Sequence, residues 1–425
     1  MADNLYFSRD TRVFIKLTGQ DFIWEVPVLD GFSFSQATNA TEVSLSEMES
    51  TAGVSNRGRQ MFNDSYAPAE WSFSTYTRPY FASSKDRSVE EVLWGLIAGK
   101  AYWDDTNKAF NKRADLAAGS GSVNQYVKQV GNLQEINFST SNTSTLGTAD
   151  IYFIMGGNRR TVASDTLTAY KIEKCVVNEV AMDFDIDGIA TLNWSGFGSL
   201  ISEVKAYSQD ASPTDSGEGA GTNPIGSVWL DTNHATPGNI VFAKTVDFGS
   251  VTTPFVAGIS STDNYIKNKL SSLDITSSDI VSGSPNAYTL TLTGGNITIS
   301  NNVTYITPET LGVVNQPIGH VTGTRSISGS FTCYLDSDLT TSSADLFEDS
   351  IEGITNVTTD VDLDFSIGGN IAANGPSVNF RMNRCHIEIP QHSIEDVISL
   401  ETNFHALPSG FDGTDELVVS YVGKG

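Results

Sequence analysis

Hydrophobic and polar residues alternate over many short stretches of this chain, which is the period of a β-strand. Residues 11–24 alternate on both sides of Gly19 and predict a hairpin, with extended chain continuing over 28–36. The stretch Trp71–Tyr76 places Trp71, Phe73 and Thr75 on one face. The same alternation predicts further strands at 133–139, 148–155, 169–180 and 189–194. Short β-branched runs separated by Gly, Asn and Ser predict a mostly β fold.

Two stretches follow the helical period instead. Residues 89–97 carry apolar positions at helical spacing, after Ser88 and Glu91 at capping-box spacing and before Gly99. A second stretch repeats this arrangement, with Ser342 and Asp345 as the capping pair, apolar Leu346, Phe347 and Ile351, and Gly353 at the end. We therefore expect one short helix in each half of the chain.

Three segments lack a clear period. Residues 38–68 are rich in Ser, Asn and Glu, and loops of this length are usually functional or disordered. Residues 101–130 form a second polar excursion. Residues 208–226 are Ser, Gly, Pro and acid, which is typical of a linker.

The second half of the chain repeats the first. The stretch Asp150–Asn158 ends in Gly-Gly-Asn, and so does Asp362–Asn370, with the Asp at the same spacing. Other matched stretches, in the same order, are 17–24 with 292–299, 72–76 with 330–334, 171–175 with 381–385 and 186–192 with 394–400. We interpret this order as an internal duplication. The expected division is a first domain over 1–205, a linker over 206–235 and a second domain over 236–425.

Composition and charge restrict the function. The 425 residues carry a formal net charge of -25, which argues against wrapping nucleic acid and against an anionic membrane surface. The charge is uneven, because residues 1–205 hold 18 basic and 25 acidic residues whereas 206–425 hold 7 and 25. No apolar signal core or membrane span is apparent. Three cysteines are too few for a disulfide scaffold, so we expect synthesis in a reducing cytoplasm.

No motif points to catalysis or to a cofactor. Residues 183–188 imitate the start of a calcium loop, but loop position twelve is Trp194, so a hairpin turn is the better interpretation. The histidines form no ligand pair, and Cys175 and Cys385 occupy equivalent positions that fit small buried core residues. A glycosidase pair among the many carboxylates is not selected by any feature. We expect no enzyme, no metal and no cofactor.

Acidic residues alternate at two places. Period-two spacing puts each of two trios on one sheet face, which is either a solvated face or an acidic lining. The trios are Asp183, Asp185 and Asp187 in the first half, and Asp360, Asp362 and Asp364 in the second. Arg57, Arg59 and Arg78 lie in or beside the long polar segment. They are either ordinary solvated residues or a surface that pairs with acids of another subunit.

Several stretches, together with the duplication, resemble one family. Residues 55–65, 69–74 and 315–320 look like those of marine and cyanobacterial phage tail proteins. The order of elements resembles the major tail tube protein of long-tailed bacteriophages, in the type with two fused tube domains. The resemblance implies a mainly β (α+β) fold. It would consist of two tandem tail-tube-like β-sandwich or half-barrel domains, each with one flanking short helix.

The resemblance also implies an assembly. Three chains would form a pseudo-hexameric ring, and rings would stack into a virion tail tube through which DNA passes without specific binding. Other expected partners are the tape measure, sheath or terminator, and tip proteins, with no membrane. The long polar segment would reach the next ring through Glu42, Glu47, Glu49, Arg57, Arg59 and Phe62. Candidate lumen acids are Asp150, Asp183, Asp185, Asp187, Asp360, Asp362 and Asp364.

Two alternatives stay open. A tail-tip or baseplate hub protein also uses duplicated tube domains in trimers, but it does not need to stack on itself. A β-sandwich carbohydrate-binding adhesin is the other. Glycan binding would require exposed aromatic rings, whereas Trp24, Trp71 and Trp194 lie in strand patterns typical of buried positions. Repetition of a helix in each half also favours the tube protein.

Overall fold

The structure is a computed structural model of the full chain. It describes residues 6–43, 60–82, 85–105, 107–112, 125–138, 145–156, 167–209, 227–231, 239–242, 265–277, 287–311, 313–336, 342–352, 361–369, 376–394, 397–410 and 415–423. The protein is mainly β, as the alternating pattern predicts, with short helices. None of the helices in these ranges is long and apolar enough to cross a membrane.

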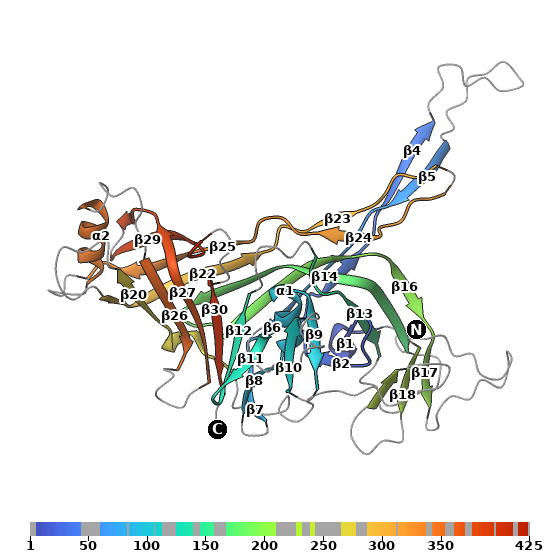
Figure 1. Ribbon diagram of the computed structural model, residues 1–425, viewed down its shortest axis with the longest axis horizontal. Helices are drawn as coiled ribbons and strands as arrows, with labels where there is room; N and C mark the ends of the chain where they lie inside the picture. Colours follow the sequence, from blue (N-terminus) through green and yellow to red (C-terminus); the bar gives the residue numbers. More distant parts are fainter. Residues whose placement is uncertain are drawn as a thin grey trace, which may run out of the picture.

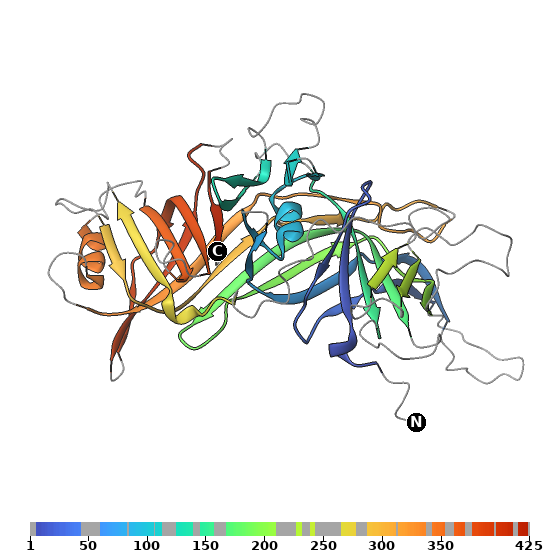
Figure 2. The ribbon, with the colours of Figure 1, turned by 90° about the horizontal axis from the view of Figure 1, so that it is seen from below.

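One antiparallel sheet runs through both halves of the chain, and its long strands lie side by side in Figures 1 and 2. We call it the eight-stranded sheet. Its strands, in spatial order, are β3 (Ser33–Ser35), β6 (Ala69–Tyr76), β15 (Thr191–Gly198), β14 (Thr168–Asp185), β22 (Leu292–Ser300), β25 (Ser326–Tyr334), β29 (Ile398–Ala406) and β28 (Gln391–Ile394). Because β14 pairs with β22, the two halves are joined inside this sheet.

Further strands cover one face of the eight-stranded sheet. In the first half these are β2 (Ile23–Val26), β1 (Arg12–Leu17), β13 (Ala149–Met155), the start of β14 and β16 (Ile201–Val204). In the second half they are β21 (Ala287–Leu290), β20 (Ser272–Ser277), β26 (Val361–Gly368), β27 (Ser377–Ile387) and β30 (Val418–Val422). The second set continues from β30 into β12 (Leu133–Asn137), β11 (Gln125–Val130), β10 (Ala109–Lys112) and β9 (Ala101–Asp104). The polar excursion of the first half is therefore joined, through β12, to the last strand of the second.

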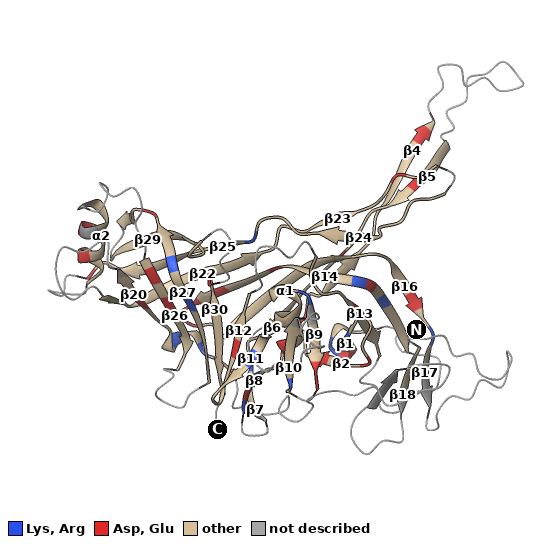
Figure 3. Cartoon of the chain, in the orientation of Figure 1, with Lys and Arg blue, Asp and Glu red and all other residues tan. Residues whose placement is uncertain are grey.

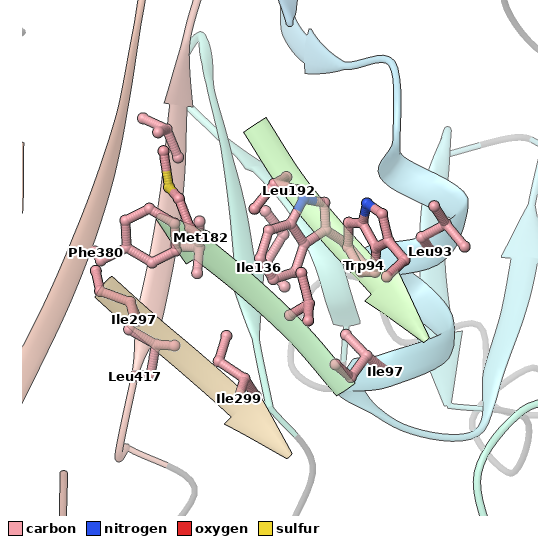
Figure 4. Close-up of a cluster of buried hydrophobic side chains, with 14 of the residues drawn as sticks. Leu93, Trp94, Ile97, Ile136, Met182, Leu192, Ile297, Ile299, Phe380 and Leu417 are labelled. Carbon is pink, nitrogen blue, oxygen red and sulfur yellow. The ribbon is translucent and has the colours of Figure 1, made fainter. Parts of the chain in front are cut away.

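The core lies between these layers. Phe365 of β26 packs against Phe331 of β25 and Phe404 of β29, at ring-centroid distances of 6.2 and 5.4 Å. Figure 4 shows the part of the core at the junction of the two halves, where Trp94 and Met182 meet Phe380. Trp24, Trp71 and Trp194 are buried, which confirms the prediction made from their strand patterns.

The remaining elements are small. They are β4 (Thr38–Val43), β5 (Gln60–Tyr66), β7 (Pro79–Ala82), β8 (Lys85–Ser88), β17 (Ala206–Gln209), β18 (Val228–Asp231), β19 (Asn239–Phe242), β23 (Thr304–Ile306), β24 (Gly319–Val321), η1 (Ser8–Asp10), η4 (Asn268–Leu270), α1 (Glu91–Ala98) and α2 (Ser343–Glu352). The expectation of an unstructured segment over 38–68 is wrong at its flanks, where β4 and β5 form a ribbon. Strands β17 and β18 lie within 206–235, while the two-domain division itself stays a prediction.

The helices form where the periodicity places them, but only α2 has the predicted cap. Asp345 accepts from the backbone N–H of Ser342, and the Ser342 hydroxyl accepts from the N–H of Asp345, both at 3.2 Å. Ser88 instead ends β8, and α1 begins at Glu91 without a side-chain cap. All eight residues of α1 are buried, so tertiary packing replaces the cap.

Strand registers support the duplication. Ala149 of β13 lies opposite Cys175, Val361 of β26 lies opposite Cys385, and each pairing then shifts by one residue. One matched stretch differs, however. Residues 17–24 turn at Gly19, which has φ of 78°, whereas 292–299 lie within the continuous strand β22. That sequence match is therefore not a structural equivalence.

Candidate lumen surface and stacking arm

The face of the eight-stranded sheet that points away from the core carries small polar and acidic side chains. We call it the polar face. Its members alternate with buried residues along each strand, and among the described positions of this face none is Lys or Arg. They include Ser33, Glu70, Ser72, Ser74, Glu179, Asp183, Asp185, Asn193, Ser195, Asn296, Thr298, Ser328, Ser330, Glu401, Asn403 and His405. Figure 3 shows few blue positions on the long strands of this sheet apart from the start of β14, which pairs with β13 and β16.

Hydrogen bonds link these side chains across the strands. Ser74 Oγ donates to Asn193 Oδ1 at 2.6 Å, and Asn193 Nδ2 donates to Asp183 Oδ2 at 3.4 Å. On the other side of the junction, Asn296 Nδ2 donates to Ser330 Oγ at 3.2 Å. Asp183 and Asn296 lie directly opposite each other. Short side chains that bond to one another leave few extended groups on this surface.

The first predicted acid trio lies at one end of the polar face. Asp183 and Asp185 are exposed on β14, and they alternate with buried Met182 and Phe184. Asp187 is exposed in the turn that follows, where Asp185 Oδ1 accepts from the Gly188 N–H at 2.7 Å. This is the predicted hairpin turn. No group of His, Cys, Asp or Glu in the described part of the chain could hold a metal ion.

Asp150 has a structural role that the repeated motif did not reveal. Its Oδ1 accepts from the backbone N–H of Lys174 at 3.0 Å, where Lys174 has a φ of 50° at the shifted pairing of β13 with β14. Burial raises the pKa of Asp150. In the second copy, burial raises the pKa of the Cys385 thiol, with a smaller effect of the charge on Asp362. The repeated Asp therefore lies beside the same irregularity in both copies.

Asp362 and Asp364 face away from the polar face. They lie on the solvent side of β26, whose other side packs on the eight-stranded sheet. Asp364 accepts a hydrogen bond from Asn379 Nδ2, and burial raises its pKa. Asp360 lies outside the described residues. The structure thus separates the predicted acids, and it adds Glu70 on β6, Glu179 on β14 and Glu401 on β29, which occupy positions of the polar face.

The ribbon of β4 and β5 projects from the body as an arm (Figure 1). Residues 304–311 and 313–321 of the second half lie along its base, where Tyr66 N–H donates to the Asn315 carbonyl at 2.9 Å and Asn315 N–H donates to the Asp64 carbonyl at 3.1 Å. Glu42 is exposed on the arm. Met61 and Phe62 are 63% and 60% exposed. We use "arm" for 38–43, 60–66, 304–311 and 313–321 together.

Four of the predicted stacking residues cannot be placed on the arm. Glu47, Glu49, Arg57 and Arg59 are outside the described residues. Arg78 is buried, with its guanidinium 4.9 Å from the centroid of the Tyr265 ring. The second half adds exposed apolar residues to the arm that sequence reasoning missed, namely Leu311, Val313, Val314 and Ile318.

Comparisons with known proteins agree with this architecture. A family model described as phage tail tube protein matches residues 48–406. The tail tube protein pb6 of Escherichia phage T5 is 27% identical over 428 residues, which cover 99% of this chain and 76% of that protein. Since the family model covers most of the sequence, the chain belongs to the phage tail tube protein family and is a structural component of a phage virion tail.

Proposed function

We propose that three copies of this chain form a ring in which their eight-stranded sheets join into one closed barrel, with the polar face inside. The sheet ends at β3 on one side and β28 on the other, and open sheet edges tend to pair with another chain. Closing the sheet removes these edges. Two different edges that pair head to tail produce a closed ring when the rotation from one chain to the next closes on itself.

The observation that carries this proposal is the composition of the polar face. DNA binding is dominated by Lys and Arg contacts to phosphates, and the described positions of this face have neither. Glu70, Glu179, Asp183, Asp185 and Glu401 would repel phosphate instead. Such a lumen lets DNA pass without specific binding, which is a mechanical role that needs no catalytic group.

Rings would stack through the arm. It extends beyond the body, and its exposed apolar residues need a partner surface. Each chain has one arm, so three arms would connect neighbouring rings. Assembly with the tape measure, sheath or terminator, and tip proteins would take place at the host's site of synthesis, the cytoplasm.

Negative-stain electron microscopy of the purified protein tests the proposal. We expect stacked tubes from the full chain and single rings after deletion of residues 41–64. Tubes of normal length from the deletion variant would refute the role of the arm. Single rings from the full chain would favour the tail-tip hub, and monomers at every protein and salt concentration would refute the ring.

A further inference from the structure

The junction between the two halves also defines how one chain meets the next, in the ring proposed above. At this junction β14 pairs with β22, with Asp183 opposite Asn296. Phe184, the next residue of β14, is only 5% exposed there. If β28 and β3 are the counterparts of β14 and β22, the same register applies between chains.

Strand registers identify β28 as the counterpart of the end of β14. In the first copy, Thr191 lies opposite both Tyr76 and Asp183. In the second copy, Ser399 lies opposite both Tyr334 and Ser393. Tyr76 and Tyr334 end the matched Ser-Phe motifs, so Ser393 corresponds to Asp183.

The same reasoning identifies β3 as the counterpart of β22. Ser33 lies opposite Ser72, and Asn296 lies opposite Ser330. Ser72 and Ser330 begin the matched motifs, so Ser33 corresponds to Asn296. In the described chain β3 pairs only with β6, and β28 pairs only with β29.

We propose that β28 of one chain pairs antiparallel with β3 of the next, with Ser393 opposite Ser33 and Gln391 opposite Ser35. An exposed apolar residue supports this pairing. Ile394 corresponds to the buried Phe184 but is 79% exposed, which is the exposure expected when its neighbour is missing. The pairing brings Ile394 next to Phe32 of the neighbouring copy, where both side chains are removed from water.

Cysteine pairs test this register. Residues directly opposite have Cα atoms about 4.5–5.5 Å apart, within disulfide range, whereas residues two positions out of register are roughly 7–8 Å apart. Chains with Ser33→Cys and Ser393→Cys, or with Ser35→Cys and Gln391→Cys, should form covalent trimers under mild oxidation. The exchanged pairs, Ser33→Cys with Gln391→Cys and Ser35→Cys with Ser393→Cys, are the matched controls.

Failure of the β28–β3 register and failure of ring formation give different results in this experiment. The edges β3 and β28 lie at opposite ends of the sheet order, so a disulfide between them must join two chains. The native cysteines are buried and give little background. If rings are visible but the exchanged pairs link as well as the predicted pairs, or no pair links, the register is wrong while the ring stands. If the unmodified chain forms no rings, the proposed function fails first.

Discussion

Glu90 lies in a buried polar network at the junction of the two halves. Its Oε1 accepts from the Tyr421 hydroxyl at 2.7 Å, and that hydroxyl accepts from Trp94 Nε1 at 2.8 Å. Burial raises the pKa of Glu90 to about 7, while the Tyr421 hydrogen bond and the charge of Arg78 partly oppose it. Tyr421 belongs to the last strand, so this network ties the C-terminal end of the chain to α1.

The free energy of unfolding should therefore depend on pH through the protonation of Glu90. In the folded chain Glu90 keeps its proton up to about pH 7, whereas its ordinary pKa is 4.5. The folded state binds more protons in this window, so stability falls as pH rises from 4.5 to 7, by up to about 3 kcal/mol. The variant Glu90→Gln removes this loss. The melting temperature of Glu90→Gln minus that of the unmodified chain should increase by several degrees between pH 5 and pH 8.

The control is Glu388→Gln, which changes an exposed glutamate just after the end of β27. Thermal unfolding at matched ionic strength is the measurement, because the overall charge also destabilises the chain at high pH. A difference between Glu90→Gln and the unmodified chain that stays constant across this pH range would contradict a protonated Glu90.

At the scale of elements, the β4–β5 ribbon of the arm differs from the β7–β8 and β23–β24 ribbons in exposing both of its faces. Met61 and Phe62 are adjacent on β5 and point to opposite sides, yet both are largely exposed. A two-stranded ribbon has no third layer to cover either side and is marginally stable alone. Contact with a neighbouring ring would supply that layer on both faces.

Replacing these two residues tests the contact without shortening the arm. The variant Met61→Ser with Phe62→Ser removes apolar area whose burial is worth roughly 1.5–3 kcal/mol per side chain. We expect rings to form normally but tubes to become shorter or to require higher protein concentration. Measured tube length in electron micrographs is the readout, and Gln60→Ser, at an exposed polar position of the same strand, is the control. Unchanged tube length would exclude these residues from stacking.

Helices and strands were predicted correctly from the sequence where local residues determine their structure. Period-two strands and the reciprocal cap of Ser342 and Asp345 are local features, and both are confirmed. The cap at Ser88 was wrong because the buried surroundings of α1, and not its first turn, stabilise it. The polar segment around β4 and β5 lacks apolar alternation because its strands have no buried side, so a strand pattern was not visible.

Sequence reasoning located the site only in part. Asp183 and Asp185 were found because their alternation is intact on β14. Asp150 and Asp362 were grouped with them because a repeated Asp carries no information about which layer it faces. The polar face itself combines strands from both halves, and their order depends on pairings between residues more than a hundred positions apart, such as Asp183 with Asn296.

For the whole molecule, the junction inside the chain has a second link besides β14 and β22. Strand β30 pairs with both β27 and β12, and Trp94 of α1 donates to Tyr421 of β30. The counterparts of these elements in the other copy are α2 and the end of β16. Figures 1 and 2 show α2 and β16 at opposite ends of the molecule, so they can meet only between chains.

Sequence spacing assigns the residue of α2 in this outer contact, and strand registers assign the residue next to β16. Glu348 lies six residues after Ser342, as Trp94 does after Ser88, and the flanking glycines have equal spacing too. Val418 of β30 lies opposite Arg381, and Ser202 of β16 lies opposite Lys171, so Tyr421 corresponds to Lys205. In the proposed ring, the oppositely charged Glu348 and Lys205 would then take the place of the Trp94–Tyr421 hydrogen bond between chains. Acidic positions on α2 and basic positions near β16 are visible in Figure 3.

Reversing the charge of either residue alone should therefore weaken the ring, and reversing both charges should restore it. Like charges that face each other across an interface are strongly unfavourable, so Glu348→Lys or Lys205→Glu should raise the apparent dissociation constant of the ring at least about tenfold at low salt. The double variant should form rings at nearly the original concentration. Screening in about 1 M salt should reduce the differences between all four proteins.

Mass photometry over a dilution series gives the fraction of chains assembled into rings. The control for net charge combines Glu348→Lys with Lys269→Glu, because Lys269 is an exposed lysine on η4. Equal rescue by Lys269→Glu would show that the overall charge, and not this contact, governs ring closure.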